Sequence, residues 1–326
     1  MSEKVLILGG AGFIGSKVTQ KLLQKGHSVA IMDTFSQYSN PLEVCFSDAI
    51  KYRKKLIEGA KIYISDASIA YDLERVCKDF CPDRIVHLAA LTRADINDDN
   101  MTAALTKSAQ PILGIMEIYK DKPEKLKRFL YVSSSYVYGN FKYSPCDEEH
   151  PKEPTSTYGG VKYACEILTG AWARRYSIPY TIVRPIAAFG PSDLNGKLSM
   201  QNIKRAIDSE ELYLMGELDE LSDYTFVDDL AEGMIAALFS DNAINDVFNL
   251  SSGQGVPVSE LLNLYNIKGY AVKPVLAKKL KSRPKRGFLS IKKAHEAFGY
   301  APKTSLSQGL DMCIEYIQKH NVNIDA

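Results

Sequence analysis

The feature that most constrains the fold is a glycine-rich stretch, LILGGAGFIG at residues 6–15, which begins within an apolar run. Gly10, Gly12 and Gly15 have the spacing G-x-G-x-x-G, and Gly9 begins a second, overlapping pattern. Glycine permits a tight turn and lets backbone amides approach a phosphate closely at the N-terminus of a helix. The residues that follow, SKVTQKLLQKG, have helical spacing. The order of strand, glycine turn and helix predicts a loop that binds the pyrophosphate of a dinucleotide.

An acidic residue stands where such a dinucleotide site needs one. Asp33 ends the next apolar run, SVAIMD, about 20 residues beyond the glycines, as expected for a carboxylate that binds ribose hydroxyls. Its negative charge disfavours the additional phosphate of NADP, so NAD is the expected cofactor. The alternative is that Asp33 is an ordinary surface turn residue, but its position relative to the glycines favours the ribose.

Further apolar runs continue the alternation of strand and helix along the chain. They begin at residues 28, 61, 84, 128 and 180 and read SVAIMD, KIYISD, RIVHLAA, RFLYVSSS and YTIVRP. Continuous apolar strands separated by helices are typical of a parallel sheet that is covered on both faces. The predicted fold class is therefore α/β, a Rossmann-type doubly wound parallel sheet with a smaller C-terminal domain. Ligands are expected at the carboxyl ends of the strands.

The regular alternation of apolar strands and helices ends after Pro185, which suggests two domains in this chain of 326 residues. We expect residues 1–180 to form the NAD-binding Rossmann domain and residues 181–326 to form mainly a substrate-binding domain. A strand and helix near residues 224–250, beginning YTFVDDLAEGMIAALF, are expected to return to the first domain. The basic run at residues 278–286 is expected to be a solvated face, although a phosphate-bearing ligand would also use it.

Composition excludes several other classes of function. The formal net charge is +1, so neither nucleic acid nor a membrane surface is an expected partner. No run of 18 apolar residues and no signal peptide is visible, so we expect a cytoplasmic protein. The six cysteines and five histidines are scattered without ligand spacing, which predicts no metal site. The GxSxG elbow of serine hydrolases does not occur.

Two tyrosine–lysine pairs have the spacing Y-x-x-x-K, and their contexts differ. Tyr138 is followed by a Gly-Asn turn signal, so Lys142 is not expected to lie near it. Tyr158 instead opens the run YGGVKYACEILTGAWARRY, whose apolar residues have helical spacing. Residues four apart share a helix face, so we expect the Lys162 ammonium beside the Tyr158 ring, where it favours the phenolate. Lowering a pKa that is ordinarily about 10 makes Tyr158 a candidate general base.

Taken together, these motifs resemble the extended short-chain dehydrogenases/reductases, and within them the NAD-dependent nucleotide-sugar epimerase/dehydratase family. The resemblance spans nearly the whole chain and rests on GGAGFIG, Asp33, SDAS, HLAA, VSSSYVYG, YGGVK, VRPIAAFGP and YTFVDDLA. The segment SRPKRGFLSIKKAHEAFGYAPKTSLSQGL is also similar to the closing segment of family members. Residues 33–68 further resemble UDP-glucuronate and UDP-galactose 4-epimerases.

The resemblance implies roles for individual residues. Ser134, five residues before Gly139, corresponds to the catalytic serine or threonine, whose hydroxyl bridges the sugar hydroxyl and Tyr158. Lys162 completes the catalytic set and also bonds the nicotinamide ribose. The implied cofactor-binding residues are Gly9, Gly12, Phe13, Ile14, Gly15, Asp33, Ser36, Asp66, Ala67, Leu88, Ala89, Ala90, Tyr158, Lys162, Pro185 and Ile186. The implied substrate-binding residues are Ser134, Ser135, Tyr136, Ala187 and Arg283.

The residues after Ser134 favour epimerisation over elimination. The 4,6-dehydratases of the family carry Asp and Glu at the next two positions, and the decarboxylases carry Glu at the second, whereas this chain has Ser135 and Tyr136. The expected function is epimerisation of a nucleotide-diphosphate sugar at C4, through a 4-keto intermediate and with tightly bound NAD. Alternatives are a dehydratase or decarboxylase, an NAD(P)H-dependent ketoreductase and, from another class, a non-catalytic nucleotide-binding regulator.

Three positions depart from the family pattern and leave the sugar and its nucleotide open. Ala187 replaces the Asn of an RxxN motif, Ser222 replaces an arginine that binds diphosphate, and Ser108 replaces a helix Asn. Arg283 matches a second diphosphate-binding arginine. The resemblance also implies a homodimer, which the helices near residues 101–120 and at Tyr158 could form; the equal alternative is that these helix faces are buried within the single chain. The expected pathway is the biosynthesis of a cell-surface polysaccharide or a modified sugar.

Overall fold

The computed structural model describes residues 2–36, 44–90, 98–194, 198, 200–215, 217–277 and 284–320 of the chain. Within these residues, seven parallel strands form one sheet in the order β11-β6-β5-β4-β1-β2-β3. They are β1 (Lys4–Leu8), β2 (Ser28–Asp33), β3 (Lys61–Ile64), β4 (Arg84–His87), β5 (Arg128–Val132), β6 (Tyr180–Pro185) and β11 (Asp246–Leu250). The order reverses between β1 and β4, and ligands bind at such a switch point. The predicted α/β, Rossmann-type fold class is confirmed.

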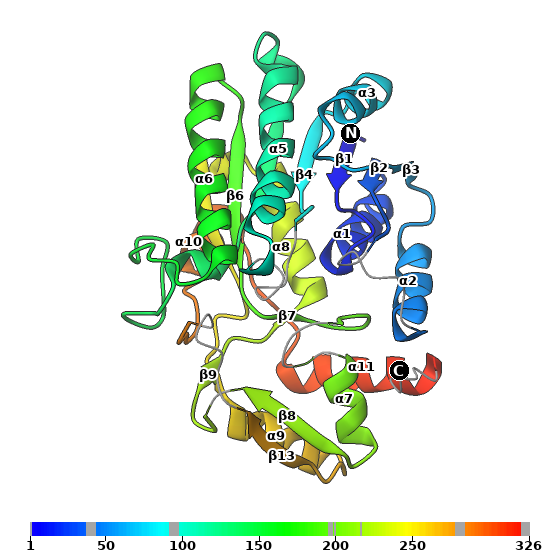
Figure 1. Cartoon of the computed structure of the whole chain (residues 1–326), viewed down its shortest axis with the longest axis vertical. Coiled ribbons are helices and arrows are strands. Elements are labelled where there is room, and N and C mark those ends of the chain that lie inside the picture. The colour runs from blue at the N-terminus through cyan, green and yellow to red at the C-terminus, as the bar shows by residue number, and fades with distance from the viewer. Residues whose placement is uncertain are drawn as a thin grey trace.

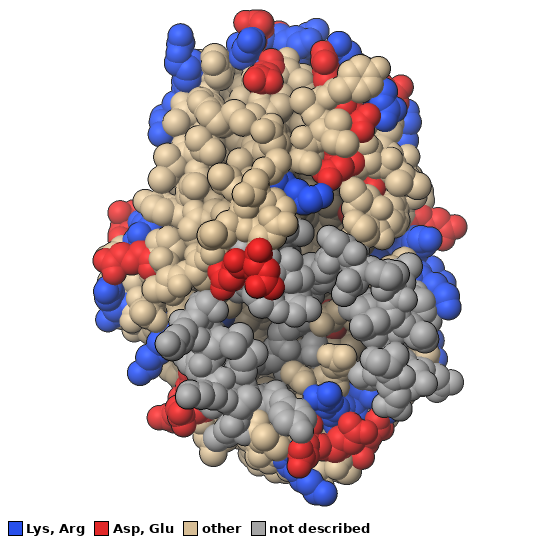
Figure 2. Space-filling model, viewed as in Figure 1, with Lys and Arg blue, Asp and Glu red and all other residues tan. Residues whose placement is uncertain are grey.

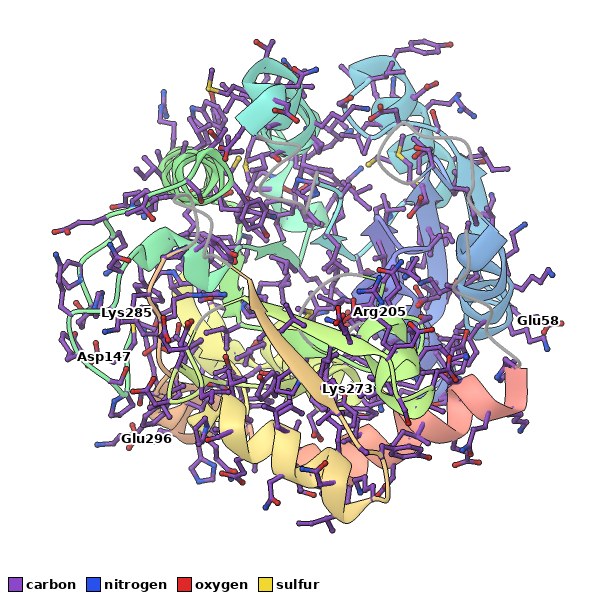
Figure 3. All side chains as sticks on the ribbon, turned by 60° about the horizontal axis from the view of Figure 1, so that its bottom comes forward. Glu58, Asp147, Arg205, Lys273, Lys285 and Glu296 are labelled. Atoms are coloured by element: carbon purple, nitrogen blue, oxygen red, sulfur yellow. The ribbon has the colours of Figure 1, made fainter. Side chains whose placement is uncertain are left out.

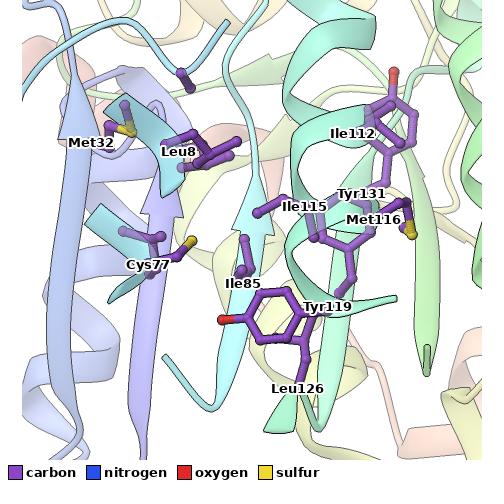
Figure 4. Packing of buried hydrophobic residues seen from close by; sticks show 14 of the residues in the cluster. Leu8, Met32, Cys77, Ile85, Ile112, Ile115, Met116, Tyr119, Leu126 and Tyr131 are labelled. Carbon is purple, nitrogen blue, oxygen red and sulfur yellow. The ribbon is translucent and has the colours of Figure 1, made fainter. Parts of the chain in front are cut away.

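Helices cover both faces of the sheet (Figure 1). One face carries α3 (Ala70–Phe80), α5 (Met101–Tyr119) and α6 (Thr157–Tyr176), and the other carries α1 (Phe13–Gln24), α8 (Val227–Phe239) and α10 (Lys292–Phe298). Figure 4 shows side chains of β1, β4 and α5, among them Leu8, Ile85 and Ile115, packed on the first face. The next residue back along β1, Ile7, belongs to the core on the second face. Burial on both faces explains why the strands are unbroken apolar runs.

Several of the remaining elements form a second lobe, drawn below the sheet in Figure 1. It contains α7 (Met200–Ile207), α9 (Val258–Ile267), α11 (Leu306–His320) and the parallel pair β8 (Glu211–Met215) and β13 (Lys273–Ala277). These helices share a separate hydrophobic core that includes Ile203, Leu261 and Leu310. An open cavity of about 480 Å³ in this lobe is lined by Arg205 and Lys273, labelled in Figure 3, with Ser209, Glu210 and Glu211. None of these five residues is a candidate site residue.

The chain returns from the second lobe to the sheet through helix α8 and strand β11, rather than through a strand at residue 224. The strand expected at residue 224 is only β10 (Thr225–Phe226), and it pairs with β7 (Ala188–Phe189) outside the main sheet. The strand that joins the sheet is β11, which lies beside β6. Helix α8, between β10 and β11, does pack on the sheet.

Shorter elements complete the described chain. They are α2 (Val44–Leu56), the pair β9 (Leu221–Ser222) and β12 (Val256–Pro257), and the 3-10 turns η1 (Pro123–Lys125), η2 (Ser135–Tyr138) and η3 (Asp241–Ala243). None of the described helices combines the length and the apolar character needed to cross a membrane.

Candidate active site

The glycine loop between β1 and α1 has the shape that a pyrophosphate needs. Gly9 has a φ of 85°, in the region that favours glycine. A Cβ atom at Gly15 would lie 2.2 Å from the Gly9 carbonyl oxygen, so α1 approaches the turn this closely only because residue 15 is glycine. The helix starts at Phe13 after the N-cap Gly12, and no side chain caps its first turn. Its first amides, among them that of Ile14, therefore suit an anion.

Asp33 is held at the end of β2 beside this loop. Its carboxylate accepts hydrogen bonds from the amides of Ala11 at 2.9 Å and Phe35 at 2.8 Å. Burial raises the pKa of the Asp33 carboxyl above its usual range, although the two amides and the positive charge of Arg53 oppose this. Ser36 is exposed three residues further along the chain. The carboxylate is thus fixed against the glycine loop, as a ribose ligand would be.

Other candidate cofactor residues lie along the same edge of the sheet. Residues 88–90 follow β4, and a Cβ atom at Gly9 would lie 2.8 Å from the amide nitrogen of residue 89, so the ends of β1 and β4 are in direct contact. Asp66 and Ala67 follow β3; Ala67 is buried, and the Asp66 carboxylate pairs with Lys107 at 2.8 Å. That ion pair holds the pKa of Asp66 below its usual range, against the effect of its partial burial. A glycine cradle, a fixed acid and small apolar residues together fit NAD.

The serine-rich stretch forms a buried shelf at the end of β5. The Ser133 amide donates to the Val183 carbonyl oxygen of β6 at 2.8 Å, which continues the sheet by one bond. Ser134 then caps η2, because its hydroxyl oxygen accepts from the Tyr136 amide at 3.3 Å. Ser133, Ser134 and Ser135 are all buried. The strand therefore ends in hydroxyl groups at the carboxyl edge of the sheet, one strand away from the switch point between β1 and β4.

Helix α6 brings Tyr158 and Lys162 to this shelf. Ser156 caps the helix by accepting from the Gly159 amide at 3.2 Å. The buried Lys162 ammonium donates to the Val132 carbonyl oxygen at 2.8 Å and lies 5.9 Å from the centre of the Tyr158 ring. Burial lowers the pKa of Lys162 to about 8. The lysine is thus held next to both the tyrosine and the strand end that leads into the serine shelf.

Close packing between α6 and η2 joins the two motifs. The rings of Tyr136 and Tyr158 meet edge to face with their centres 5.3 Å apart. A Cβ atom at Gly159 would lie 2.6 Å from the Tyr136 carbonyl oxygen, so the helix reaches η2 only because residue 159 is glycine. The structure therefore brings Ser134, Tyr158 and Lys162 into one region.

An arginine that was not singled out from the sequence reaches this region. Arg286 donates to the Ser135 hydroxyl at 3.0 Å, and its guanidinium lies 4.4 Å from the centre of the Tyr136 ring. Residues 284–290 run along the loop after η2, where the Phe141 amide donates to the carbonyl oxygen of Lys285 at 2.9 Å (Figure 3). Arg283, the expected substrate residue, lies outside the described residues. The feature of the sequence that pointed toward Arg286 was its position in the basic run at residues 278–286.

The first Y-x-x-x-K pair has a different environment. The Tyr138 hydroxyl is buried, donates to Asn249 Oδ1 at 2.7 Å and accepts from Arg184 at 2.8 Å. Lys142 forms an exposed ion pair with Glu153. The lysine that lies beside its tyrosine is therefore that of the second pair, Lys162.

The end of β6 completes the edge of the site. Pro185 is half-buried and Ile186 is buried, while Ala187 is exposed and has a φ of 38°. The Ala187 carbonyl oxygen accepts from the Thr225 amide at 3.2 Å. A left-handed alanine is strained, and such strain is concentrated at functional sites. In the described part of the chain, no three His, Cys, Asp or Glu side chains gather into a group that could hold a metal ion.

Comparison with known proteins agrees with this geometry. A sequence model of the NAD dependent epimerase/dehydratase family matches residues 5–251. The UDP-glucose 4-epimerase of Thermotoga maritima, solved with UDP-glucose, is 30% identical over 97% of this chain and 99% of its own, with a TM-score of 0.85. The UDP-glucuronic acid 4-epimerase of Bacillus cereus was solved with UDP-glucuronic acid and NAD. It is 26% identical over 97% of this chain and 99% of its own, with a TM-score of 0.86. The UDP-glucuronate 4-epimerase of Thermodesulfobacterium geofontis is 24% identical over 98% of this chain and 97% of its own.

These matches confirm the family recognised in the sequence and NAD as its cofactor. The glycine cradle, the Asp33 carboxylate and the Tyr158–Lys162 helix occur in one chain, at one edge of one sheet. The chain belongs to the NAD-dependent epimerase/dehydratase family.

Proposed function

We propose that this protein is an isomerase that inverts the C4 hydroxyl of a UDP-hexose or UDP-hexuronate. The observation that carries the proposal is the meeting of Ser134, Tyr158 and Lys162 at a shelf that continues with Ser135 and Tyr136. Neither of these two shelf residues is the Asp or Glu that the resemblance associates with elimination or decarboxylation at these positions. The similarity to UDP-glucose and UDP-glucuronate 4-epimerases supports the choice of substrate.

Each residue of the proposed set has a defined task in the reaction. Tyr158, as phenolate, takes the proton of the C4 hydroxyl while Ser134 holds that hydroxyl and directs its proton. The Lys162 ammonium stabilises the phenolate electrostatically. NAD, bound along the glycine loop, supplies the chemistry of hydride uptake and return. Tyr158 would then return the proton to the same oxygen as the C4 hydroxyl is restored in the inverted configuration.

Substrate contacts are proposed along the shelf and beside it. Ser135 and Tyr136 lie next to Ser134, and Ala187 ends the neighbouring strand. Arg286 joins Arg283 as a candidate ligand for an anionic group of the substrate, because its guanidinium is already placed over Tyr136. A guanidinium binds phosphate or carboxylate through two parallel hydrogen bonds, which a lysine cannot reproduce.

The decisive experiment is to incubate the purified protein with UDP-glucose, UDP-galactose, UDP-glucuronate and UDP-galacturonate without added cofactor. We expect a product of unchanged mass, by mass spectrometry, with inverted C4 stereochemistry by proton NMR. The Tyr158→Phe variant should lose at least about 100-fold in rate while retaining NAD, because it lacks the general base. A product lighter by water or carbon dioxide would overturn the proposal.

We also propose that two copies of the chain associate through α5 and α6. This face shows few charged residues in Figure 2, and it exposes the large apolar side chains of Met101, Leu105 and Ile167. Light scattering should give twice the chain mass, and Leu105→Glu with Ile167→Glu should halve it. A wild-type monomer at micromolar concentration would contradict the proposal.

The cellular setting is proposed on the same basis. We propose that the protein acts in the cytoplasm, where nucleotide sugars are made, and that its product supplies polysaccharide biosynthesis. Fractionation of cells should recover the activity with the cytoplasmic fraction. Loss of the gene should change the sugar composition of a surface polysaccharide; an unchanged composition would reject that role.

A further inference from the structure

A buried arginine joins three of the elements that meet at the candidate active site. Arg184 lies near the end of β6 and is only 3% exposed. Its Nε and Nη2 donate to the two carboxylate oxygens of Glu166 on α6, at 2.9 and 2.7 Å. Its Nη1 donates to the Tyr138 hydroxyl of η2 at 2.8 Å. One guanidinium therefore ties β6 to the helix that carries Tyr158 and to the turn that carries the serine shelf.

Glu166 lies next to Lys162 on the same face of α6. The two residues are one helical turn apart, and residues four apart on a helix have about 5–6 Å between their Cβ atoms. Both side chains are buried, with 4% of Lys162 and 5% of Glu166 exposed. A carboxylate and an ammonium that are both shielded from water attract each other strongly at this separation. The structure must therefore keep the two charges apart if the ammonium is to serve another group.

The two charges have separate partners on adjacent strands. The Lys162 ammonium donates to the Val132 carbonyl oxygen of β5 at 2.8 Å. Both carboxylate oxygens of Glu166 instead accept from Arg184. Val132 is paired in register with Val183, and Arg184 is the next residue along β6. The partner of the ammonium and the partner of the carboxylate are thus fixed at the same level of the sheet.

The other titratable groups that interact with Lys162, within the described residues, are uncharged near neutral pH. The ring of Tyr131 on β5 has its centre 5.1 Å from Lys162 Nζ, and burial raises the pKa of its hydroxyl well above the usual range. Burial also raises the pKa of the Cys165 thiol on α6 and lowers the pKa of His87 on β4 to about 3. Glu166 is thus the acidic group whose negative charge acts on Lys162.

Two further charges lie near Tyr158. The Arg286 guanidinium lies over the Tyr136 ring, which packs against Tyr158 edge to face. Asp98 accepts from the Thr157 amide at 3.3 Å, at the start of α6. Both charges are the same in every variant compared below, so differences between the variants report the buried ion pair.

We propose that Arg184 is a positioning residue that holds the Glu166 carboxylate away from Lys162, so that the ammonium remains with Tyr158. The inference rests on the proposed function for the role of Tyr158 as general base. Without the guanidinium, the side chain at residue 166 follows the tilt of a helix toward its N-terminus, and its carboxylate pairs with the ammonium one turn earlier. The ammonium then stabilises the phenolate less, so Tyr158 gives up its proton only at higher pH.

The test follows the ionisation of Tyr158 directly in the purified holoenzyme. Tyrosinate is measured by ultraviolet difference absorbance during a pH titration, and the titration of the same protein carrying Tyr158→Phe is subtracted. Arg184→Met should move the midpoint of this ionisation upward by about one pH unit or more relative to wild type. Because the phenolate fraction below the midpoint falls about tenfold per pH unit, kcat near neutral pH should fall about tenfold while KM changes little.

Breaking the same ion pair from its other side is the matched control. Glu166→Gln leaves Arg184 without its carboxylate partner but removes the acid beside Lys162, so the midpoint should not rise. Both single variants lose the pair and should unfold at a lower temperature than wild type. A merely structural role of the pair would therefore disturb the titration in both variants, whereas the proposal predicts a rise in only one.

Two additional variants complete the comparison. In Arg184→Met combined with Glu166→Gln, the neutral amide cannot attract the ammonium, so the midpoint should return to the wild-type value. If Arg184→Met does not fold, Arg184→Gln replaces it in both comparisons, because its amide can still donate to Glu166 but carries no charge.

Two results overturn the inference. One is a midpoint that does not rise in the folded Arg184 variants, which would mean that the Glu166 carboxylate takes up a proton itself and leaves Lys162 undisturbed. The other is an equal rise in Glu166→Gln. If wild type converts no UDP-sugar, the proposed function fails instead, and the titration of Tyr158 still decides whether Arg184 controls its ionisation.

Discussion

At the scale of single residues, the buried ammonium group of Lys162 gives the protein a specific dependence on pH. Burial lowers the pKa of Lys162 from 10.5 to about 8, so the unfolded chain binds this proton more tightly than the folded chain. The charged lysine therefore opposes folding below about pH 8, and stability rises as the pH increases from there to about 10.5. The difference between the two pKa values corresponds to about 3 kcal/mol.

The Lys162→Met variant isolates this contribution. We expect the free energy of unfolding of wild type, minus that of the variant, to rise by up to about 3 kcal/mol between pH 8 and 10.5. Urea unfolding at a series of pH values measures it, and the subtraction removes the titration of other groups. A difference that stays constant with pH would mean that the ammonium is not held in a buried position.

Tyr138, in contrast, contributes through hydrogen bonds that hold the end of η2. Burial raises the pKa of its hydroxyl, which stays protonated and donates to Asn249 while accepting from Arg184. Tyr138→Phe leaves both partners without this hydroxyl and should lower the free energy of unfolding by about 1–3 kcal/mol. It should also lower kcat, because η2 carries the serine shelf.

The matched control is Tyr143→Phe. The Tyr143 hydroxyl bonds to Asp147 at 2.8 Å, but on an exposed surface. Thermal unfolding should place this variant within about 0.5 kcal/mol of wild type. Equal losses in the two variants would contradict a special role for the buried network.

At the scale of elements, the approach of α6 to η2 depends on one of two adjacent glycines. A side chain at Gly159 would meet the Tyr136 carbonyl oxygen at 2.6 Å, whereas a side chain at Gly160 would meet nothing within 4 Å. Gly159→Ala must push the start of α6 away from the shelf and so displace Tyr158 from Ser134. We expect kcat to fall at least about 100-fold, as misplaced catalytic groups commonly cause.

Gly160→Ala should behave in the opposite way. It should keep wild-type activity and gain about 0.5–1 kcal/mol in stability, because alanine favours the helix and the space is open. Initial rates with the accepted UDP-sugar and urea unfolding measure both effects. Comparable rates for the two variants would show that α6 does not need this close contact.

Local chemistry explains which elements could be predicted from the sequence. The glycine loop, the strand ends and the helix of Tyr158 are set by neighbouring residues, so their patterns were sufficient to predict the fold class and the family. Arg286 reaches Ser135 across 151 residues, and Arg53 reaches Ser192 across 139. No local pattern singles out Arg286 within the basic run, because its contact with Ser135 is set by the path of the chain through space. The two-residue strand β10 is likewise too short for a periodic signal.

At the scale of the whole molecule, buried polar contacts join segments that are distant in the sequence. Asp223 is fully buried and accepts from the amides of Ser252 and Leu289, each at 3.0 Å. It thereby ties the segment between β9 and β10 to the loop after β11 and to the segment that carries Arg286. The candidate active site is consequently built from segments that leave the sheet and come back to it.

This path predicts that residues 1–185 do not fold as a unit on their own. The fragment lacks α8 and β11, whose buried side chains Leu230, Met234, Leu238 and Phe248 cover the second face of the sheet. Each such side chain contributes about 1.5–3 kcal/mol, and together they approach the whole stability of a typical domain. The fragment should show no cooperative unfolding transition and should bind a hydrophobic dye.

A joined chain tests the reason for this behaviour. β7 and β10 are parallel, so residue 190 lies at the opposite end of the pair from residue 224, and a glycine-serine linker of about a dozen residues is needed to run back along the pair and connect them. Residues 1–190 joined in this way to residues 224–254 regain α8 and β11, and should recover a cooperative transition in urea. If the fragment 1–185 already unfolds cooperatively, residues 1–185 are an independent domain. In that case the returning helix and strand serve the site rather than the stability of the sheet.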